Sequence, residues 1–315
     1  MDPLRLLCEQ QGFFTRAQAV DCGLSDKQIA HAVRHRTWTR IRRGYYSFSD
    51  TWSSLDSVAQ HRILCTAVVH SLGPEVVVLS HVSGLVVPGI DTWDVDLSRV
   101  HVTRLDAGAG RIEGDVVHHE GFVDHGEVTV VDGLPVLPAV RCALETASTV
   151  VGEVGLCLLD RGLHLRRFDH DDLVRQFSVM EHWPRMRHLH VPVRMADEAS
   201  ASIGESRGRW FFWVHRLPAP RLQYDVTDDD GVLVGTTDWA WPRLGLLGEF
   251  DGKVKYGRLL KPGMDPGDVV FAEKRREDAL RRATGFGMER LVWDDYQRPR
   301  VLAARLREAM GIRAS

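Results

Sequence analysis

Two neighbouring β-prone runs near the C-terminal end of the chain constrain its fold more than any other part of the sequence. The runs cover residues 232–241 and 244–251, and only Pro242 and Arg243 separate them. Two such runs joined by so short a connection predict a β-hairpin. The number of residues in the turn then decides which side chains share a face.

The hairpin carries three acidic residues, which gather on one face if the turn holds two residues. In that register Asp238 pairs with Leu247 and lies on the face of Glu249 and Asp251, which are roughly 7 Å apart because side chains alternate along a strand. A three-residue turn moves Asp238 to the opposite face. Crowded carboxylates cost free energy that a divalent cation offsets, so these three acids are candidate metal ligands. The alternative is a face open to water whose acids are solvated.

The length and composition of the chain predict a soluble protein with more than one domain. Its 315 residues indicate two or three domains, and we place them at residues 1–50, 51–199 and 200–315. The net charge of −3 gives no overall attraction to nucleic acid, so such a contact needs a local basic patch. Five scattered cysteines without CxxC spacing are typical of reduced thiols. The first residues do not form a signal peptide, and no apolar run approaches the length of a membrane span. We therefore expect a cytoplasmic protein.

The first fifty residues predict a winged helix. Thr15 and Ser25 are in position to cap a second and a third short helix. In the third helix, Ile29 and the apolar residues that follow it face inward. Residues 37–48 alternate around Gly44, which predicts a hairpin. Two helices, a recognition helix and a β-wing make up the winged-helix plan.

A cluster of arginines covers the end of this recognition helix and the wing. Residues 30–46 contain no acid and five arginines: Arg34, Arg36, Arg40, Arg42 and Arg43. Arginines in these places clamp phosphates while the helix enters the major groove, so DNA is the expected partner. The alternatives are a solvated basic face and a wing that binds protein. Trp38 and Tyr45 are expected in the core of the wing.

The N-terminal segment resembles a known family. Its motifs GFFTRAQA at residues 12–19, GLS at 23–25 and RIRRGYY at 40–46 are similar to the N-terminal winged helix of AbiEi-type antitoxins. Those proteins belong to type IV toxin–antitoxin and abortive-infection systems. The resemblance implies a DNA-binding repressor of its own operon, with a cognate toxin as a possible partner. Residues 51–199 are weakly like the α/β second domain of the same antitoxins.

The C-terminal segment resembles a second family. The motifs ESRGR at residues 205–209, DWAWP at 238–242, EFDG at 249–252 and EKRREDALR at 273–281 follow in one order. This succession resembles the very-short-patch-repair-like branch of the PD-(D/E)XK nucleases over residues 200–296. The resemblance implies a restriction-endonuclease-like α/β core in the order α-β-β-β-α-β. It also implies hydrolysis of phosphodiester bonds with Mg²⁺ or Mn²⁺, with Glu205 on a helix and Asp238, Glu249 and Asp251 at the metal.

One departure from that nuclease pattern affects the functional prediction. The signature places a lysine two residues after Glu249, and this chain has Asp251 there. Lys253, Lys255 or Lys274 is a candidate to replace it as the residue that orients the attacking water. We expect a DNA-binding protein with a metal-dependent endonuclease-like domain in phage defence or a toxin–antitoxin setting. The alternative is a non-catalytic repressor or antitoxin whose nuclease fold is inactive.

Several histidines lie in the middle of the chain without the spacing of a metal site. They are His101, His118, His119, His125 and His164. If residues 118 and 119 lie in a strand, their side chains point to opposite faces. We interpret these residues as surface or capping histidines.

Overall fold

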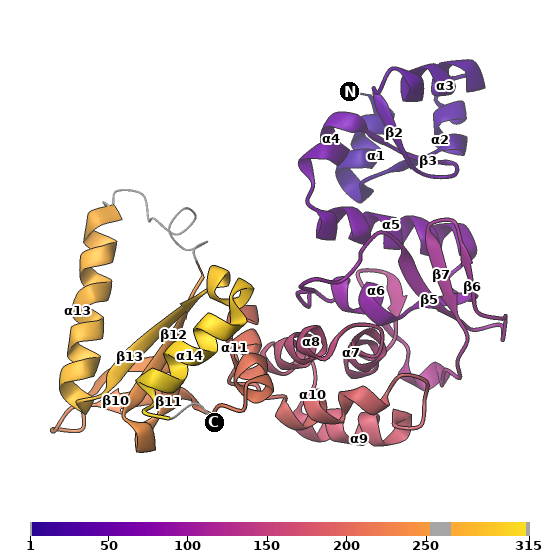
Figure 1. Cartoon of the computed structure of the whole chain (residues 1–315). Helices are drawn as coiled ribbons and strands as arrows, with labels where there is room; N and C mark the ends of the chain where they lie inside the picture. Colours follow the sequence, from indigo (N-terminus) through magenta and orange to yellow (C-terminus); the bar gives the residue numbers. More distant parts are fainter. Residues whose placement is uncertain (1, 253–265, 313–315) are drawn as a thin grey trace. The chain divides into compact units, whose positions relative to one another are not determined.

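The computed structural model describes residues 2–252 and 266–312 of the chain (Figure 1). These residues form two compact units. The first comprises residues 1–162 and 167–193, and the second comprises residues 163–166 and 194–315. The winged helix and most of the middle segment thus belong to one unit. The division into three domains at residues 50 and 199 stays a prediction. None of the helices in the described ranges is long and apolar enough to cross a membrane.

The N-terminal part has the elements expected of a winged helix. They are α1 (Pro3–Gln11), β1 (Phe14–Thr15), α2 (Arg16–Asp21), α3 (Asp26–Arg34), β2 (Trp38–Arg42) and β3 (Tyr45–Phe48). The three strands pair antiparallel in the order β1-β3-β2. Thr15 with Gln18, and Ser25 with Gln28, form capping boxes that begin α2 and α3. Gly44, at φ +80°, makes the turn of the wing.

An aromatic cluster holds the helices of this part on its sheet. Phe14 is fully buried and its ring lies 4.7 Å from that of Trp38, edge to face. Ile29 of α3 is buried in the same cluster. Tyr45 is buried on the other face of the sheet, beside Phe13. The expectation that Trp38 and Tyr45 are core residues of the wing is confirmed.

A six-stranded mixed sheet follows the winged helix. Its strands are β4 (Val77–Leu79), β5 (Val100–Arg104), β6 (Arg111–Glu113), β7 (Val116–His119), β8 (Thr129–Val131) and β9 (Leu134–Val136). Their order is β6-β7-β5-β4-β9-β8, in which β5 runs parallel to β7 and β4 parallel to β9. The core is built from buried valines and leucines of these strands and of one long helix.

Helices precede, connect and follow the strands of this sheet. They are α4 (Ser49–Ser54), α5 (Ser57–Leu72), α6 (His81–Val86), α7 (Ala139–Ala147), α8 (Gly152–His164), α9 (His170–Met180) and α10 (His190–Met195). The 3-10 turns η1 (His125–Glu127) and η2 (Arg187–Leu189) complete this part. The core of the sheet includes Cys65, Val68 and Val69, so α5 packs against it.

The C-terminal unit contains a four-stranded sheet with a parallel last strand. Its elements are α11 (Ile203–Val214), β10 (Arg221–Thr227), β11 (Leu233–Trp241), η3 (Pro242–Leu244), β12 (Leu246–Asp251), α13 (Pro266–Thr284), β13 (Gly287–Val292), η4 (Trp293–Gln297) and α14 (Pro299–Ala309). The strand order is β10-β11-β12-β13, antiparallel except for β12 with β13. The expected order α-β-β-β-α-β is therefore present. The assignment of this sheet to a restriction-endonuclease-like core stays a prediction.

The expected register of the β11–β12 hairpin is wrong. Trp241 pairs with Leu246, and Leu247 pairs with Ala240, not with Asp238. The connection is longer than two residues because a 3-10 turn follows Trp241 and ends at Gly245, whose φ of +62° reverses the chain. Since the register shifts by two residues, an even number, the alternation of faces is unchanged.

Candidate nucleic-acid interface

The cations of the winged helix divide into an exposed set and a paired one. The exposed set consists of Arg34 at the end of α3, Arg36 in the following turn, Arg40 in β2 and Arg43 at the tip of the wing. We call these four residues the wing arginines. No carboxylate among the described residues forms an ion pair with them, whereas Arg5 and Arg16 of the same part do pair with acids. The wing arginines are therefore available to a bound anion.

Arg42 differs from the other four arginines. Its Nη1 lies 3.2 Å from Oδ2 of Asp115, in the turn between β6 and β7, and its side chain is 14% exposed. A DNA-binding role for Arg42 therefore stays a prediction, and this ion pair opposes it. The acid that neutralises Arg42 lies 73 residues further along the chain, outside the acid-free segment.

The other side of the wing is covered by the middle of the chain. A bulge in β2 falls between Arg40 and Arg42. Ile41 packs into a cluster with Tyr45 and Ala67 of α5, and the Tyr45 hydroxyl lies 2.8 Å from Nδ1 of His70. This side of the wing is therefore closed to a ligand.

The exposed face of α3 adds Lys27 and His31 to the wing arginines. Lys27, His31 and Arg34 are exposed and recur at helical spacing, opposite the buried Ile29.

Residues 1–49 match the family model of the transcriptional regulator AbiEi antitoxin. This finding supports the resemblance for the N-terminal, AbiEi-like segment. No curated protein matches the chain. The AbiEi-like segment ends at residue 49, so the nuclease resemblance of residues 200–296 stays a prediction.

Asp238 and Glu249 of the C-terminal sheet lie near each other. Burial raises the pKa of Glu249, neighbouring Arg276 opposes this rise, and the charge of Asp238 adds to it. Asp238 Oδ2 also accepts a hydrogen bond of 2.7 Å from the main-chain N–H of Phe250. Two of the expected acids are thus brought together, and one of them is tied to the backbone of the adjacent strand.

Two arginines form ion pairs with the carboxylate of Glu249. Nη2 of Arg276, on α13, lies 2.5 Å from Oε1, and Nη2 of Arg290, on β13, lies 3.5 Å from Oε2. Arg276 also donates to the main-chain oxygen of Thr236 at 2.7 Å. The guanidinium groups of Arg276 and Arg290 therefore supply the positive charge that the sequence suggested a metal ion would supply to Glu249.

The Glu205 side chain accepts hydrogen bonds at the N-terminal end of α11. Its carboxylate accepts hydrogen bonds from the N–H of Ala201 at 2.9 Å, the hydroxyl of Ser202 at 2.7 Å and Nε2 of Gln223 at 3.1 Å. The side chain is buried, and these contacts satisfy it within the first turn of the helix. A role for Glu205 in catalysis stays a prediction.

The expected Mg²⁺ or Mn²⁺ site of this sheet stays a prediction. Among the described residues, the three metal-ligand side chains whose ligand atoms lie within 4.8 Å of one another are histidines, not Asp238, Glu249 and Asp251. Lys274 is exposed on α13. Lys253 and Lys255 lie outside the described residues. The catalytic and metal-binding roles of these side chains stay predictions.

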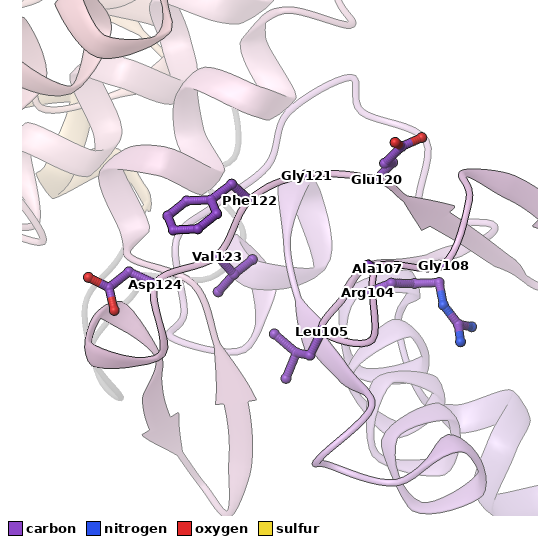
Figure 2. Close-up of a pocket in the computed structure, with 9 residues that line it drawn as sticks. All are labelled: Arg104, Leu105, Ala107, Gly108, Glu120, Gly121, Phe122, Val123 and Asp124. Atoms are coloured by element: carbon purple, nitrogen blue, oxygen red, sulfur yellow. The ribbon is translucent and has the colours of Figure 1, made fainter.

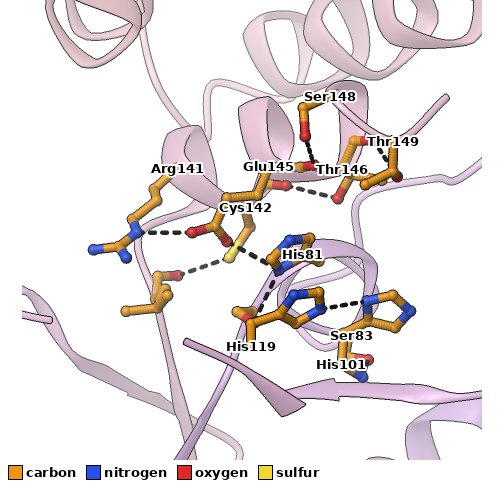
Figure 3. Close-up of polar contacts among 12 residues, drawn as sticks. His81, Ser83, His101, His119, Arg141, Cys142, Glu145, Thr146, Ser148 and Thr149 are labelled. Atoms are coloured by element: carbon orange, nitrogen blue, oxygen red, sulfur yellow. Dashed lines mark hydrogen bonds and ion pairs between the residues drawn. The ribbon is translucent and has the colours of Figure 1, made fainter. Parts of the chain in front are cut away.

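The converging histidines come from three separate elements of the first unit. His101 of β5 and His119 of β7 share a face of the sheet, and His81 begins α6 over that face (Figure 3). Nδ1 of His101 lies 2.9 Å from Nε2 of His119, and the rings of His81 and His119 stack with centroids 3.6 Å apart. We call these three residues the histidine cluster. The interpretation of His101 and His119 as surface or capping residues is wrong.

The sequence offered one signal for the histidine cluster, the alternation within β7. His118 is buried on the face opposite to His119, as alternation predicts. His101 pairs with Val117, so His119 follows two residues later on the same face. Only knowledge that β5 and β7 are neighbours makes this arrangement visible.

Burial keeps the histidine cluster neutral at pH 7. Burial lowers the pKa of His101 to about 4 and that of His119 to about 4, and it lowers the pKa of His81 well below its usual value. Arg141 of α7 faces His81 and lowers its pKa further, whereas Asp96 faces His101 and opposes the shift. Neutral imidazoles retain a nitrogen lone pair.

We expect the stability of the first unit to fall when the solution is acidified from pH 6.5 to 4. The unfolded chain protonates His101 and His119 near pH 6.5, whereas the folded chain resists until about pH 4. The unfolded state therefore binds more protons in this window, and the loss is on the order of 3 kcal/mol for each of the two histidines. Urea unfolding at several pH values measures it. The same slope in His119→Gln would contradict the assignment.

A hollow lies at the ends of the parallel strands β5 and β7 (Figure 2). Its volume is about 550 Å³, and it is lined by Arg104, Leu105, Ala107, Gly108 and residues 120–124. Phe122 is 83% exposed, and its main-chain oxygen accepts a hydrogen bond of 2.9 Å from Nη2 of Arg141. Nε of Arg141 also lies 2.9 Å from Oε1 of Glu145. Arg141 therefore links the rim of the hollow to the acid beside His81.

Proposed function

We propose that this protein is a DNA-binding transcriptional regulator of the AbiEi antitoxin type. The observation that carries the proposal is the exposed set of wing arginines on a segment that matches such regulators. In the proposed complex, α3 enters the major groove and the wing arginines hold phosphates on both sides of it. The closed side of the wing, at Ile41 and Tyr45, faces away from DNA.

The charge of the protein supports a local contact of this kind. The chain carries a net charge of −3, so its attraction to DNA depends on the patch formed by α3 and the wing. A regulator of this type acts where the DNA is, and we place it in the cytoplasm. The name of the matching family implies a cognate toxin, and we propose such a protein as a second partner.

The test of this proposal is the binding of the full chain to duplex DNA from the region upstream of its own gene. A shuffled duplex of the same composition is the control. We expect tighter binding to the first duplex, and affinity for both that falls steeply with salt because phosphate contacts release counterions. No binding to either duplex at low salt would overturn the proposal.

Two observations favour a second candidate function, an endonuclease-like activity of the C-terminal unit. The order α-β-β-β-α-β is the one expected of the nuclease core, and Asp238 and Glu249 lie close together on β11 and β12. Against it, Arg276 and Arg290 already neutralise Glu249.

We expect the full chain to leave supercoiled plasmid uncut with Mg²⁺ or Mn²⁺, because Arg276 and Arg290 already pair with Glu249. Gel electrophoresis of plasmid and labelled oligonucleotides measures this. The variants Asp238→Asn and Glu249→Gln keep the size of the side chains, and Asp278→Asn, exposed on α13, is the matched control. Cleavage by wild type and Asp278→Asn that disappears in the other two variants would establish the nuclease instead.

A further inference from the structure

The histidine cluster brings together the ligand atoms of a metal site. His81, His101 and His119 each offer one ring nitrogen, and the three nitrogens lie within 4.8 Å of one another. All three side chains are half-buried, so an ion can reach them. We propose that the histidine cluster binds a divalent transition-metal ion, with Zn²⁺ as the ion to test first.

The spacing of the ligands allows a tetrahedral ion. Zn–N bonds of about 2.0–2.1 Å place two ligand nitrogens roughly 3.3 Å apart. The nitrogens of His101 and His119 are 2.9 Å apart and share a hydrogen bond. Replacing the shared proton by an ion therefore requires a small outward movement of the rings. The stacked ring of His81 must rotate to direct its nitrogen to the same point.

The chemistry of the ligands selects the class of metal. Imidazole nitrogens suit Zn²⁺, Ni²⁺ and Cu²⁺, whereas Mg²⁺ and Ca²⁺ prefer oxygen ligands. Because burial holds the histidines in the neutral form, protons compete weakly for these nitrogens at pH 7. The expected ion therefore belongs to a different class from the Mg²⁺ or Mn²⁺ predicted for the C-terminal sheet.

Glu145 supports His81 as carboxylates support metal-bound histidines. Oε2 of Glu145 lies 3.3 Å from Nδ1 of His81, and the same oxygen accepts the main-chain N–H of that residue at 3.3 Å. Metal-binding histidines commonly donate their second ring N–H to a carboxylate, which fixes the ring and strengthens the ligand. Nδ1 of His81 also forms a hydrogen bond of 3.1 Å with Oγ of Ser80, so Nε2 of His81 is the nitrogen left for the ion (Figure 3). Arg141 balances the charge of the buried acid.

The backbone holds His81 and His101 in place. His81 has a φ of +49°, a conformation that residues other than glycine adopt at a cost and that clusters at functional sites. The main-chain N–H of His101 donates to Oγ of Ser83 at 2.8 Å, and the same oxygen lies 2.9 Å from Nε2 of His61. His61 is thus committed to a structural contact and is not a fourth ligand.

Three protein ligands leave one position on a tetrahedral ion. In proteins with three histidines at zinc, water or a bound molecule takes this position. The site we infer is therefore open, unlike a closed structural site of four protein ligands.

The experiment is a titration of the full chain with Zn²⁺ after treatment with a chelator, followed by calorimetry. His31 and His35 of the winged helix are exposed, and their rings are 4.0 Å apart, so they are removed to prevent a competing contact with Zn²⁺. All proteins therefore carry His31→Ala and His35→Ala. We expect one tightly bound ion per chain and a rise in melting temperature that Mg²⁺ does not cause.

The variants separate the cluster from other histidines. His101→Gln and His119→Gln are each expected to weaken Zn²⁺ binding at least 100-fold, and Glu145→Gln about 10-fold. His118→Gln changes the adjacent residue on the opposite face of β7 and is the matched control. Its Zn²⁺ affinity should equal that of the parent. Equal affinity in His119→Gln, or no tight binding by the parent, would overturn the proposal.

A measurement on the parent, whose histidine cluster is intact, keeps the test valid if the cluster variants fail to fold. X-ray absorption of the Zn²⁺-loaded parent identifies the ligands of the ion directly. Three imidazole nitrogens and one oxygen ligand are expected. Coordination by oxygen alone, or by sulfur, would place the ion elsewhere and reject the histidine cluster.

Discussion

Replacing all four wing arginines, Arg34, Arg36, Arg40 and Arg43, by alanine is expected to lower the affinity of the protein for DNA by about 1,000-fold at about 0.15 M salt. Log affinity falls with log salt, and each lost phosphate contact makes the slope of this fall less steep by roughly 0.9. Four lost contacts reduce its steepness by roughly 3.6. All four side chains are exposed, so their loss leaves the core intact. Fluorescence anisotropy of a labelled duplex over a range of salt concentrations measures both quantities.

Arg42→Ala is the matched control for the wing arginines. Because Arg42 pairs with Asp115 at 3.2 Å, its loss should leave the salt slope unchanged. It should cost about 1 kcal/mol or less of stability, since Asp115 is partly exposed. A slope that falls as much in Arg42→Ala as in Arg40→Ala would show that Arg42 leaves Asp115 to bind DNA.

Trp239→Ala is expected to destabilise the C-terminal unit by about 3–5 kcal/mol. Trp239 is fully buried, and its ring lies 5.1 Å from that of Phe212. A Cβ atom at Gly208 of α11 would lie 2.3 Å from this indole, so a residue without a side chain at this position leaves room for Trp239. Nε1 of Trp239 has no hydrogen-bond partner among the described residues, and the loss is therefore one of packing. Domains are stable by only about 5–15 kcal/mol, so much of the margin disappears.

Limited proteolysis and urea unfolding measure the effect of Trp239→Ala. Cleavage should increase within residues 194–312 and remain unchanged in the winged helix, whose core is separate. Trp213 is 47% exposed on α11, so Trp213→Ala is the matched control. This substitution should lower the free energy of unfolding by no more than about 1 kcal/mol. Equal losses in the two variants would contradict the central position of Trp239.

The elements whose signals lie close together in the sequence were predicted correctly. Thr15 and Ser25 begin their helices because each cap needs only a partner three residues away, Gln18 or Gln28. The alternation around Gly44 predicted the wing for the same reason. The match at residues 1–49 supports the reading of this segment as a regulator.

The hairpin of the C-terminal sheet was predicted only in part from such local signals. The sequence predicted its strands and the shared face of Asp238 and Glu249. The turn was misjudged, because a proline that begins a 3-10 turn and the left-handed Gly245 add two residues to it. Turn conformation depends on how the flanking strands twist and pack, which residue types alone do not specify.

Local sequence signals were enough to predict the main elements, their order and the basic character of the wing. Which charged and titratable groups meet depends on the packing of distant elements. Asp115 neutralises Arg42, Arg276 and Arg290 occupy Glu249, and the histidines of three separate elements converge. The physical reason is that helix caps and strand alternation are set by neighbours within a few residues. Ion pairs and ligand sets depend on strand order and helix docking, and these are fixed by burial of the whole core.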